Sequence, residues 1–196
     1  MDPLAARAYA FEQLATRLPA DLYYHSIAHT EDVSRAVLAL SALERVAQED
    51  VVLLETAAAY HDVGFVWQYH ANEQRAADLA QQVLPGFGFS PEQIRTVYGL
   101  IMATQVPQRP HTHLEEIMCD ADLDYLGRED FYMNAHGLYR EWSAYGTKLS
   151  LRQWYELQME FLQAHHYFTA SARTLREAGK QRHIEEIREL LSSGRA

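Results

Sequence analysis

Histidines and aspartates in three separated stretches are the residues whose types and spacing could do chemistry. The stretches are YYHSIAHTEDV (23–33), AYHDVG (59–64) and CDADLD (119–124). Imidazole nitrogens and carboxylate oxygens together form a donor set that suits divalent transition metals. In a chain with ten histidines, a His-Asp pair or a His-x-x-x-His spacing arises readily by chance, so order and context must carry the interpretation.

The His-Asp pair follows the most apolar run of the chain. In VVLLETAAAYHDVG (51–64), Glu55 is the only charged residue before His61. Such a helix is normally buried, and a buried carboxylate at Asp62 needs a partner. A cation would satisfy it, and a buried hydrogen bond to histidine or a pair with arginine are the alternatives. Gly64 is well placed as the residue that follows the helix.

The first stretch leaves two arrangements open. His25 and His29 share one face if the helix already begins at Tyr24. If Ser26 is instead the N-cap, His25 lies in the entering loop and the two histidines have different roles.

The third stretch presents its aspartates to different sides of a predicted helix over 114–126. Asp122 falls within the edge of the apolar stripe, so it is the carboxylate expected to face the core. Asp120 and Asp124 are expected on a solvated face or in a cap.

The elements that must position these residues are helices. Apolar residues spaced three and four positions apart fill most of the chain, all six prolines fall at breaks, and no alternating strand pattern is present. We predict an all-α, single-domain helical bundle of roughly nine helices, with Ser90 as an N-cap. The core is expected over about 22–145 and the C-terminal helices over about 150–192. The expected helices span 3–18, 27–47, 50–63, 71–84, 90–104, 114–126, 129–145, 150–165 and 169–192.

Composition and net charge limit the classes of partner and the compartment expected for this protein. The net charge is −10 and no basic stripe is present, which argues against nucleic acid and membrane surfaces as partners. The one cysteine, Cys119, excludes an internal disulfide and fits a reducing compartment. The chain shows no signal-peptide layout and no membrane-spanning run, so a cytoplasmic location is expected. A homodimer stays open.

Read in order, His29, the His61-Asp62 pair and Asp122 resemble the HD-domain superfamily of metal-dependent phosphohydrolases, whose core is a helical bundle. The resemblance covers most of residues 22–190. It extends into a C-terminal part that is similar to one bacterial group of these proteins. The stretches that carry it are YYHSIAHTEDV, AAAYHDVGF, HANEQRAADLAQQVLPGFGFSPEQI, CDADLDYLG and WYELQMEFLQAHHYFTASARTLRE.

This resemblance implies metal ligands at His29, His61, Asp62 and Asp122. YHSIAH is also similar to the Tyr-His-Asn-x-x-His stretch of cyclic-nucleotide phosphodiesterases. There the first histidine protonates the leaving group and the second binds metal, which implies that His25 is the acid.

One departure concerns the number of metals. Members with two metals generally have further histidines between the His-Asp pair and the last aspartate. Here His70 is one candidate, Thr104 stands where a second would be, and His111 and His113 fall in a loop expected to be exposed. One ion is therefore expected.

The expected ion is Mn, Fe, Co, Ni or Zn, with Mg as a further option. The expected reaction is hydrolysis of a phosphoester of a nucleotide or another small phosphorylated metabolite by metal-activated water. Asp62 would orient or deprotonate that water, and His25 would donate a proton to the leaving oxygen.

Groups that could bind the rest of the substrate are less specific. His70, Arg75, Arg109 and Lys148 are candidates for the phosphate, with surface solvation as the alternative. The aromatic residues Phe65, Trp67 and Tyr69 are candidates for a pocket wall, with plain packing as the alternative. The incomplete second-metal set motivates another function, a catalytically inactive nucleotide-binding regulatory module on the same fold. A purely structural helical protein is a third possibility.

Overall fold

The computed structural model describes residues 1–193, and this part of the chain contains helices and their connections without a strand. The predicted all-α class is therefore confirmed. No helix in the described part is both long enough and apolar enough to cross a membrane. The elements are α1 (Pro3–Arg17), α2 (Ile27–Leu43), α3 (Gln48–Tyr60), η1 (Val63–Val66), α4 (Asn72–Val83), η2 (Leu84–Phe87), α5 (Pro91–Ala103), α6 (His113–Asp122), η3 (Asp124–Gly127), α7 (Phe131–Ala144), α8 (Leu151–Ala164) and α9 (Ala170–Ser192).

Local capping explains why the helices begin where they do. Ser90, as predicted, caps α5 in a capping box with Gln93. Ser150 caps α8 in the same way with Gln153. In each box the serine side chain and the glutamine side chain satisfy backbone N–H groups that have no partner inside the helix. Sequence rules therefore locate these starts to within a residue.

Two predicted helices are wrong at their C-terminal ends. The helix expected over 27–47 ends at Leu43, because Arg45 adopts a left-handed backbone with φ of 57°. The helix expected over 114–126 is two elements, since the backbone turns at Leu123 between α6 and the short turn η3. This turn separates the directions of Asp122 and Asp124.

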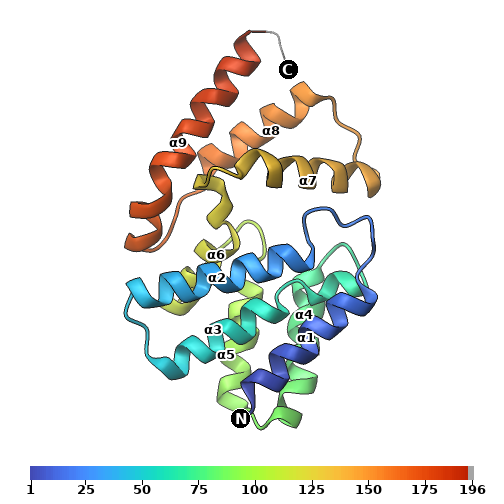
Figure 1. Ribbon diagram of the computed structural model, residues 1–196, viewed down its shortest axis with the longest axis vertical. Helices are drawn as coiled ribbons and strands as arrows, with labels where there is room; N and C mark the ends of the chain where they lie inside the picture. Colours follow the sequence, from blue (N-terminus) through green and yellow to red (C-terminus); the bar gives the residue numbers. More distant parts are fainter. Residues whose placement is uncertain (194–196) are drawn as a thin grey trace.

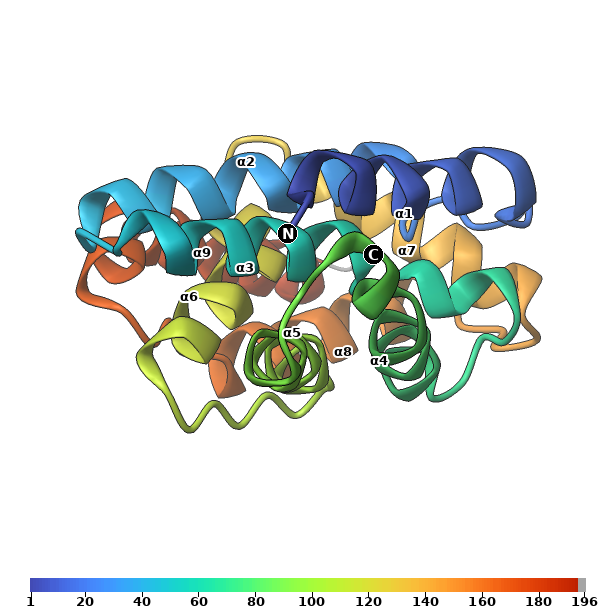
Figure 2. The ribbon, with the colours of Figure 1, turned by 90° about the horizontal axis from the view of Figure 1, so that it is seen from below.

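The larger hydrophobic core surrounds α3, which packs against α1, α2 and α5. Figure 1 shows α1 to α5 as the lower part of the molecule, and both Figure 1 and Figure 2 show α3 lying next to α2. Tyr60 at the end of α3 is fully buried, and its hydroxyl donates a hydrogen bond to the carbonyl of Ala6 at 2.9 Å. The end of α3 is thereby anchored deep in the protein.

A second hydrophobic cluster forms where η3 meets α7, α8 and α9. These elements make up the upper part in Figure 1, and α6 lies at the junction with the lower part. Tyr24, in the loop before α2, also belongs to this cluster. The loop that carries the first candidate histidine is therefore held between the two clusters.

Two aspartates of the CDADLD stretch hold α9 and the segment before it. The sequence predicts a solvated face or a cap for both, and the solvated face is wrong because both are buried. Asp120 is fully buried and accepts the backbone N–H groups of Phe168 and Thr169, each at 2.8 Å. Asp124 is 5% exposed and accepts hydrogen bonds from the Arg176 guanidinium at 2.6 and 3.1 Å. Both are buried because α9 and the segment before it cover α6 and η3.

Two glycines allow α9 to approach η3 closely. A Cβ at Gly127 would lie 2.2 Å from the carbonyl oxygen of Arg176, and a Cβ at Gly179 would lie 2.0 Å from that of Gly127. Both obstacles are backbone atoms, which a rotamer change cannot move. Any larger residue at Gly179 must push α9 away from η3.

We expect Gly179→Ala to lower the free energy of unfolding by about 1–3 kcal/mol, the usual cost of overpacking. The clash outweighs the better helix propensity of alanine, which is worth about 1 kcal/mol. Urea unfolding followed by circular dichroism measures the difference. Gly86→Ala is the control, because its Cβ would meet nothing within 4 Å. Equal effects of the two substitutions would contradict this account.

Candidate metal centre

The start of α2 decides between the two arrangements of the first histidine pair. Ser26 is the N-cap with an extended backbone, and the helix begins at Ile27. His29 therefore lies in the first turn of α2, whereas His25 lies in the loop before it. The two histidines consequently have different surroundings, although their rings are only 6.0 Å apart.

The C-terminal end of α3 brings in the second imidazole and the first carboxylate. His61 caps α3, and its Nδ1 lies 2.8 Å from the carbonyl oxygen of Ala58. This carbonyl can only accept, so Nδ1 carries the proton and donates. In the neutral ring the Nε2 lone pair then points toward the interior. A carbonyl that accepts a hydrogen bond from one ring nitrogen commonly orients the other nitrogen of a histidine toward a metal in this way.

Four side-chain atoms from α2, α3 and α6 converge. The Nε2 atoms of His29 and His61 are 3.3 Å apart. Asp62 Oδ2 lies 3.5 Å from the His29 nitrogen and 3.2 Å from the His61 nitrogen. Asp122 Oδ1 lies 3.3 and 3.5 Å from the same two atoms. Ligands about 2.1 Å from one ion and at right angles to each other are about 3 Å apart, so these separations are close to those of a coordination sphere.

His29, His61 and Asp122 form a group that can hold a metal ion, with ligand atoms all within 4.8 Å of one another. Asp62 Oδ2 is as close to the two imidazole nitrogens as Asp122 Oδ1 is, so Asp62 is a fourth candidate ligand beside this group. Within residues 1–193 this is the one group of three or more such side chains that fits an ion.

Asp62 provides a separate test of the fit. Its Oδ1 lies 3.4 Å from the Asn72 amide nitrogen, whereas its buried Oδ2 accepts no hydrogen bond from the described residues. A buried carboxylate oxygen without a partner is costly, and a cation would satisfy it. The donors present therefore fit a divalent ion.

Gly64 explains how Asn72 comes close to Asp62. A Cβ at Gly64 would lie only 1.9 Å from the Asn72 carbonyl oxygen, so only glycine lets the start of α4 pack on η1. The sequence interpretation of Gly64 as the residue ending the helix is wrong, because α3 ends at Tyr60 and Gly64 lies within η1.

The electrostatic field around the candidate ligands is negative, as the pKa shifts of nearby groups indicate. Burial raises the pKa of Glu73, and the charges of Asp62 and Asp122 raise it further. Burial opposes ionisation of Asp122, but hydrogen bonds with His29 and His61 outweigh it and hold the pKa of Asp122 below its ordinary value. The pKa of Tyr24 is raised by burial and by neighbouring acidic groups that include both aspartates. Such a site favours a cation.

His25 interacts with Glu141, a residue that the sequence interpretation missed. Glu141 is fully buried on α7, and its Oε1 lies 2.5 Å from His25 Nδ1. Its Oε2 accepts the backbone N–H groups of Tyr24 and His25, each at 3.0 Å. The periodicity of α7 offered a signal, because Glu141 lies three positions after Leu138 and next to Trp142, on the helix face that meets the rest of the protein.

This contact fixes the charge state and direction of the His25 ring. Burial lowers the pKa of His25, but the charges of Asp62 and Glu141 outweigh that effect, so its pKa is raised. The ring also stacks on Phe65, with centroids 4.2 Å apart. With Nδ1 engaged by Glu141, Nε2 is the ring atom left for a ligand.

A cavity of about 490 Å³ opens at the aspartates. Its lining includes His25, Asp62 and Asp122, together with two of the predicted aromatic residues, Phe65 and Tyr69. The volume lies within the usual range for small-molecule sites. The structure thus brings the candidate ligands and the candidate acid to one cavity.

Two positions considered for a second metal also line this cavity. Thr104 is buried, with its hydroxyl donating to the Ile101 carbonyl at 2.8 Å. His70 is exposed at the rim and is not part of the ion-holding group. His111 and His113 are exposed, as expected. The buried Cys119 thiol donates to the Ala103 carbonyl, away from the ligand set.

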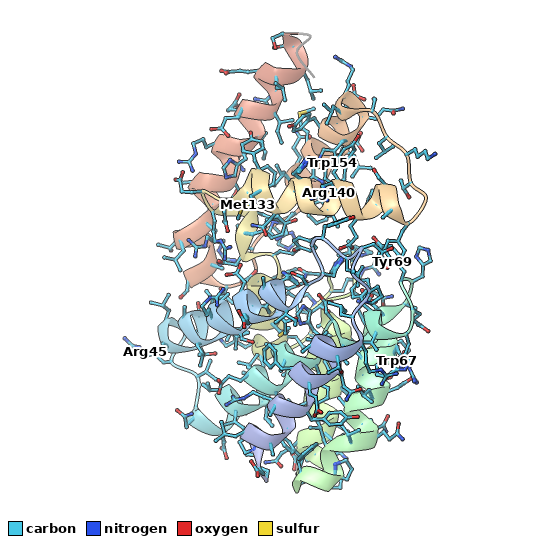
Figure 3. The ribbon with its side chains drawn as sticks, turned by 45° about the vertical axis from the view of Figure 1, so that its right-hand side comes forward. Arg45, Trp67, Tyr69, Met133, Arg140 and Trp154 are labelled. Carbon is cyan, nitrogen blue, oxygen red and sulfur yellow. The ribbon has the colours of Figure 1, made fainter. Side chains whose placement is uncertain are left out.

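The structure does not bring the predicted cationic residues to the cavity. The guanidinium of Arg75 lies 4.8 Å from the centre of the Trp67 ring, and that of Arg17 lies 4.6 Å from the same ring. Arg109 and Lys148 are exposed and do not line the cavity. Figure 3 shows Tyr69 near the junction of the two parts and Trp67 below it, beside α4. The packing of the helices sets where these cationic side chains lie, and their charge does not bring them to the cavity.

Comparison with known proteins supports the fold. No family model matches the chain, and no curated protein sequence matches it. Among solved structures, the crystal structure of YpgQ from Bacillus subtilis in complex with ADP is similar to this chain, with a TM-score of 0.67 over 97% of each chain. The sequence identity is 17%, so the likeness shows a shared fold.

We expect a divalent transition metal to stabilise the protein by binding the folded state. At a concentration of Mn²⁺ one hundred times its dissociation constant, the gain is about 2.7 kcal/mol. Thermal unfolding with and without Mn²⁺ measures it. Asp122→Asn keeps the shape of the side chain but removes its charge and should abolish most of the gain. His111→Ala, at an exposed histidine, is the control and should keep all of it. A gain that persists unchanged in Asp122→Asn would place the ion elsewhere.

Proposed function

We propose that this protein is a metal-dependent phosphohydrolase of the HD-domain type, acting on a phosphoester bond of a nucleotide or another small phosphorylated metabolite. One observation carries the proposal. The group of His29, His61 and Asp122 lies beside Asp62, and both aspartates line the cavity. The cavity is also lined by the partly buried His25, whose Nδ1 contacts the buried Glu141. A cation site beside a proton donor is the arrangement that phosphoester hydrolysis needs.

The nucleotide part of the proposal draws on the structural comparison. YpgQ shares the fold over nearly the whole chain and was crystallised with ADP. The cavity is large enough for a small organic phosphate. A nucleotide is therefore the first class of substrate to test.

The set of imidazole and carboxylate ligands suits an open site for Mn, Fe, Co, Ni or Zn. A closed structural zinc site would more often contain thiolates. When bound, such an ion supplies a water of lowered pKa and polarises a phosphoryl oxygen. His29, His61 and Asp122 would hold it, with Asp62 Oδ2 as a fourth candidate ligand.

The chain's own residues would handle the protons. Asp62 Oδ2 accepts no hydrogen bond from the described residues, so it is available to orient and deprotonate the attacking water. His25 lies on the cavity wall, and the charges of Asp62 and Glu141 raise its pKa, so its Nε2–H can donate to the leaving oxygen. Glu141 is a positioning residue, because it acts only through His25.

One observation favours a second candidate, a nucleotide-binding regulatory module without turnover. Among the described residues that line the cavity, none is lysine or arginine. Charge on a phosphate group there would rely on the metal, His25 and His70. Ligand binding without turnover would support this candidate.

The first experiment measures turnover of nucleotides, cyclic nucleotides and p-nitrophenyl phosphates with Mn²⁺ or Ni²⁺. We expect turnover that a chelator removes and metal restores. Asp62→Ala should lower kcat/KM by about 10²- to 10⁴-fold, because a general base and a neighbour of the metal are lost together. Asp78→Ala, at an exposed aspartate on α4, is the control. Full activity in Asp62→Ala protein that contains no metal would refute the proposal.

The second experiment concerns pH. A general acid must be protonated, so kcat/KM falls as the pH rises through the pKa of His25. Glu141→Gln removes the negative charge that raises this pKa, so the alkaline limb of the profile should move to lower pH. Above neutral pH we expect kcat/KM to fall by about tenfold or more. Glu160→Gln, at an exposed glutamate on α8, should leave the profile unchanged. An unmoved alkaline limb in Glu141→Gln would exclude His25 as the acid.

A further inference from the structure

The cavity lining has two chemically different parts. Asp62 and Asp122, together with His25 in the loop before α2, form a polar part. Helices α7 and α8 contribute the other part, with Leu138, Trp142, Leu157, Gln158 and Phe161. A phosphate with a cation suits the first part, whereas the second part suits a planar apolar group.

Gln158 is the one polar side chain in the part from α7 and α8. It lies four residues after Trp154 and four before Leu162, both of which are buried on the same face of α8. At 3% exposure it occupies a core position of the helix, where an apolar residue is expected.

The amide of Gln158 has no partner within the described chain. Its Oε1 is enclosed and accepts no hydrogen bond, and no hydrogen bond to its side chain is formed by residues 1–193. Burying an amide without a partner is unfavourable, and a leucine would fill the same position without that cost. The side chain therefore destabilises the ligand-free protein and needs a partner from outside the chain.

A glutamine amide offers a donor and an acceptor side by side. A nucleobase edge presents the complementary pair, as adenine does with its amino group and the adjacent ring nitrogen. Bases also pack on aromatic surfaces, which Trp142 and Phe161 provide in this part of the lining. A sugar or a simple alkyl phosphate would leave the amide unpaired or the aromatic wall uncovered.

We infer that Gln158 recognises the base of a nucleotide, with α7 and α8 forming the base subsite and the polar part of the lining receiving the phosphates. This inference deepens the proposed function and rests on it for the orientation of the ligand. It makes a base-bearing phosphate the preferred ligand over one without a base.

The test compares Gln158→Leu with the wild-type protein, and with Gln163→Leu, an exposed glutamine on the same helix, as control. Binding of ADP, adenosine and ribose 5-phosphate is measured by calorimetry, and turnover of nucleotides and p-nitrophenyl phosphate is measured with Mn²⁺. Mn²⁺ binding to each variant checks that the metal site is intact.

In Gln158→Leu we expect the dissociation constants of ADP and adenosine to rise about 10- to 100-fold. The kcat/KM for p-nitrophenyl phosphate should fall much less than that for nucleotides, because that substrate has no base edge to pair with the amide. The ligand-free variant should unfold at a higher urea concentration than wild type. A merely structural glutamine would instead lower that midpoint and leave the preference for base-bearing ligands unchanged.

The outcomes separate the two proposals. Turnover that is equally fast with and without a base, and unaffected by Gln158→Leu, would overturn the base subsite and leave the hydrolase intact. Adenosine binding that Gln158→Leu weakens, with no phosphoester turned over under any metal, would support the subsite and overturn the hydrolase. Neither turnover nor preference for base-bearing ligands would overturn both.

Discussion

Two carboxylates facing two buried imidazoles, largely removed from water, are the constraint on which the rest of the structure depends. Asp62 and Asp122 come from different helix ends, and each lies within 3.5 Å of the nitrogens of His29 and His61. Charges removed from water are expensive unless they are compensated. The chain compensates them incompletely, since one Asp62 oxygen accepts no hydrogen bond from the described residues and the two aspartates raise the pKa of neighbouring Glu73. The fold therefore keeps a position that favours a cation.

The short CDADLD stretch connects the candidate ligands to the C-terminal helices. Asp122 belongs to the ligand set, while Asp120 binds the backbone before α9 and Asp124 pairs with Arg176 on α9. Three carboxylates within five residues thus have three separate partners, because the chain turns at Leu123. The same segment positions a ligand and attaches the C-terminal helices, which in turn carry Glu141 and Gln158 to the cavity.

The cavity lies beside the second hydrophobic cluster, which supplies its apolar residues from α7 and α8. Asp62 and Asp122 make another part of the lining acidic, and Gln158 is the polar group among the residues from α7 and α8. Glu141 links α7 to the loop before α2. Its carboxylate contacts the His25 ring and accepts two backbone N–H groups of that loop. Packing of the C-terminal helices is consequently part of how the site is formed.

The sequence by itself determined the helical class and most helix boundaries, because periodicity and capping are local properties. It also indicated His29, His61 and Asp122 as ligands of one ion, because their order along the chain is a linear property. The tertiary structure alone decided which distant groups meet. Glu141 lies 116 residues after His25, and nothing in the spacing indicates that the two touch. The sequence predicts a solvated face or a cap for Asp120 and Asp124, because a helix pattern does not reveal a second layer of helices that covers them. Arg75, Arg109 and Lys148 were chosen for their charge, yet the direction in which a helix or loop presents a charge depends on packing between elements far apart in the chain.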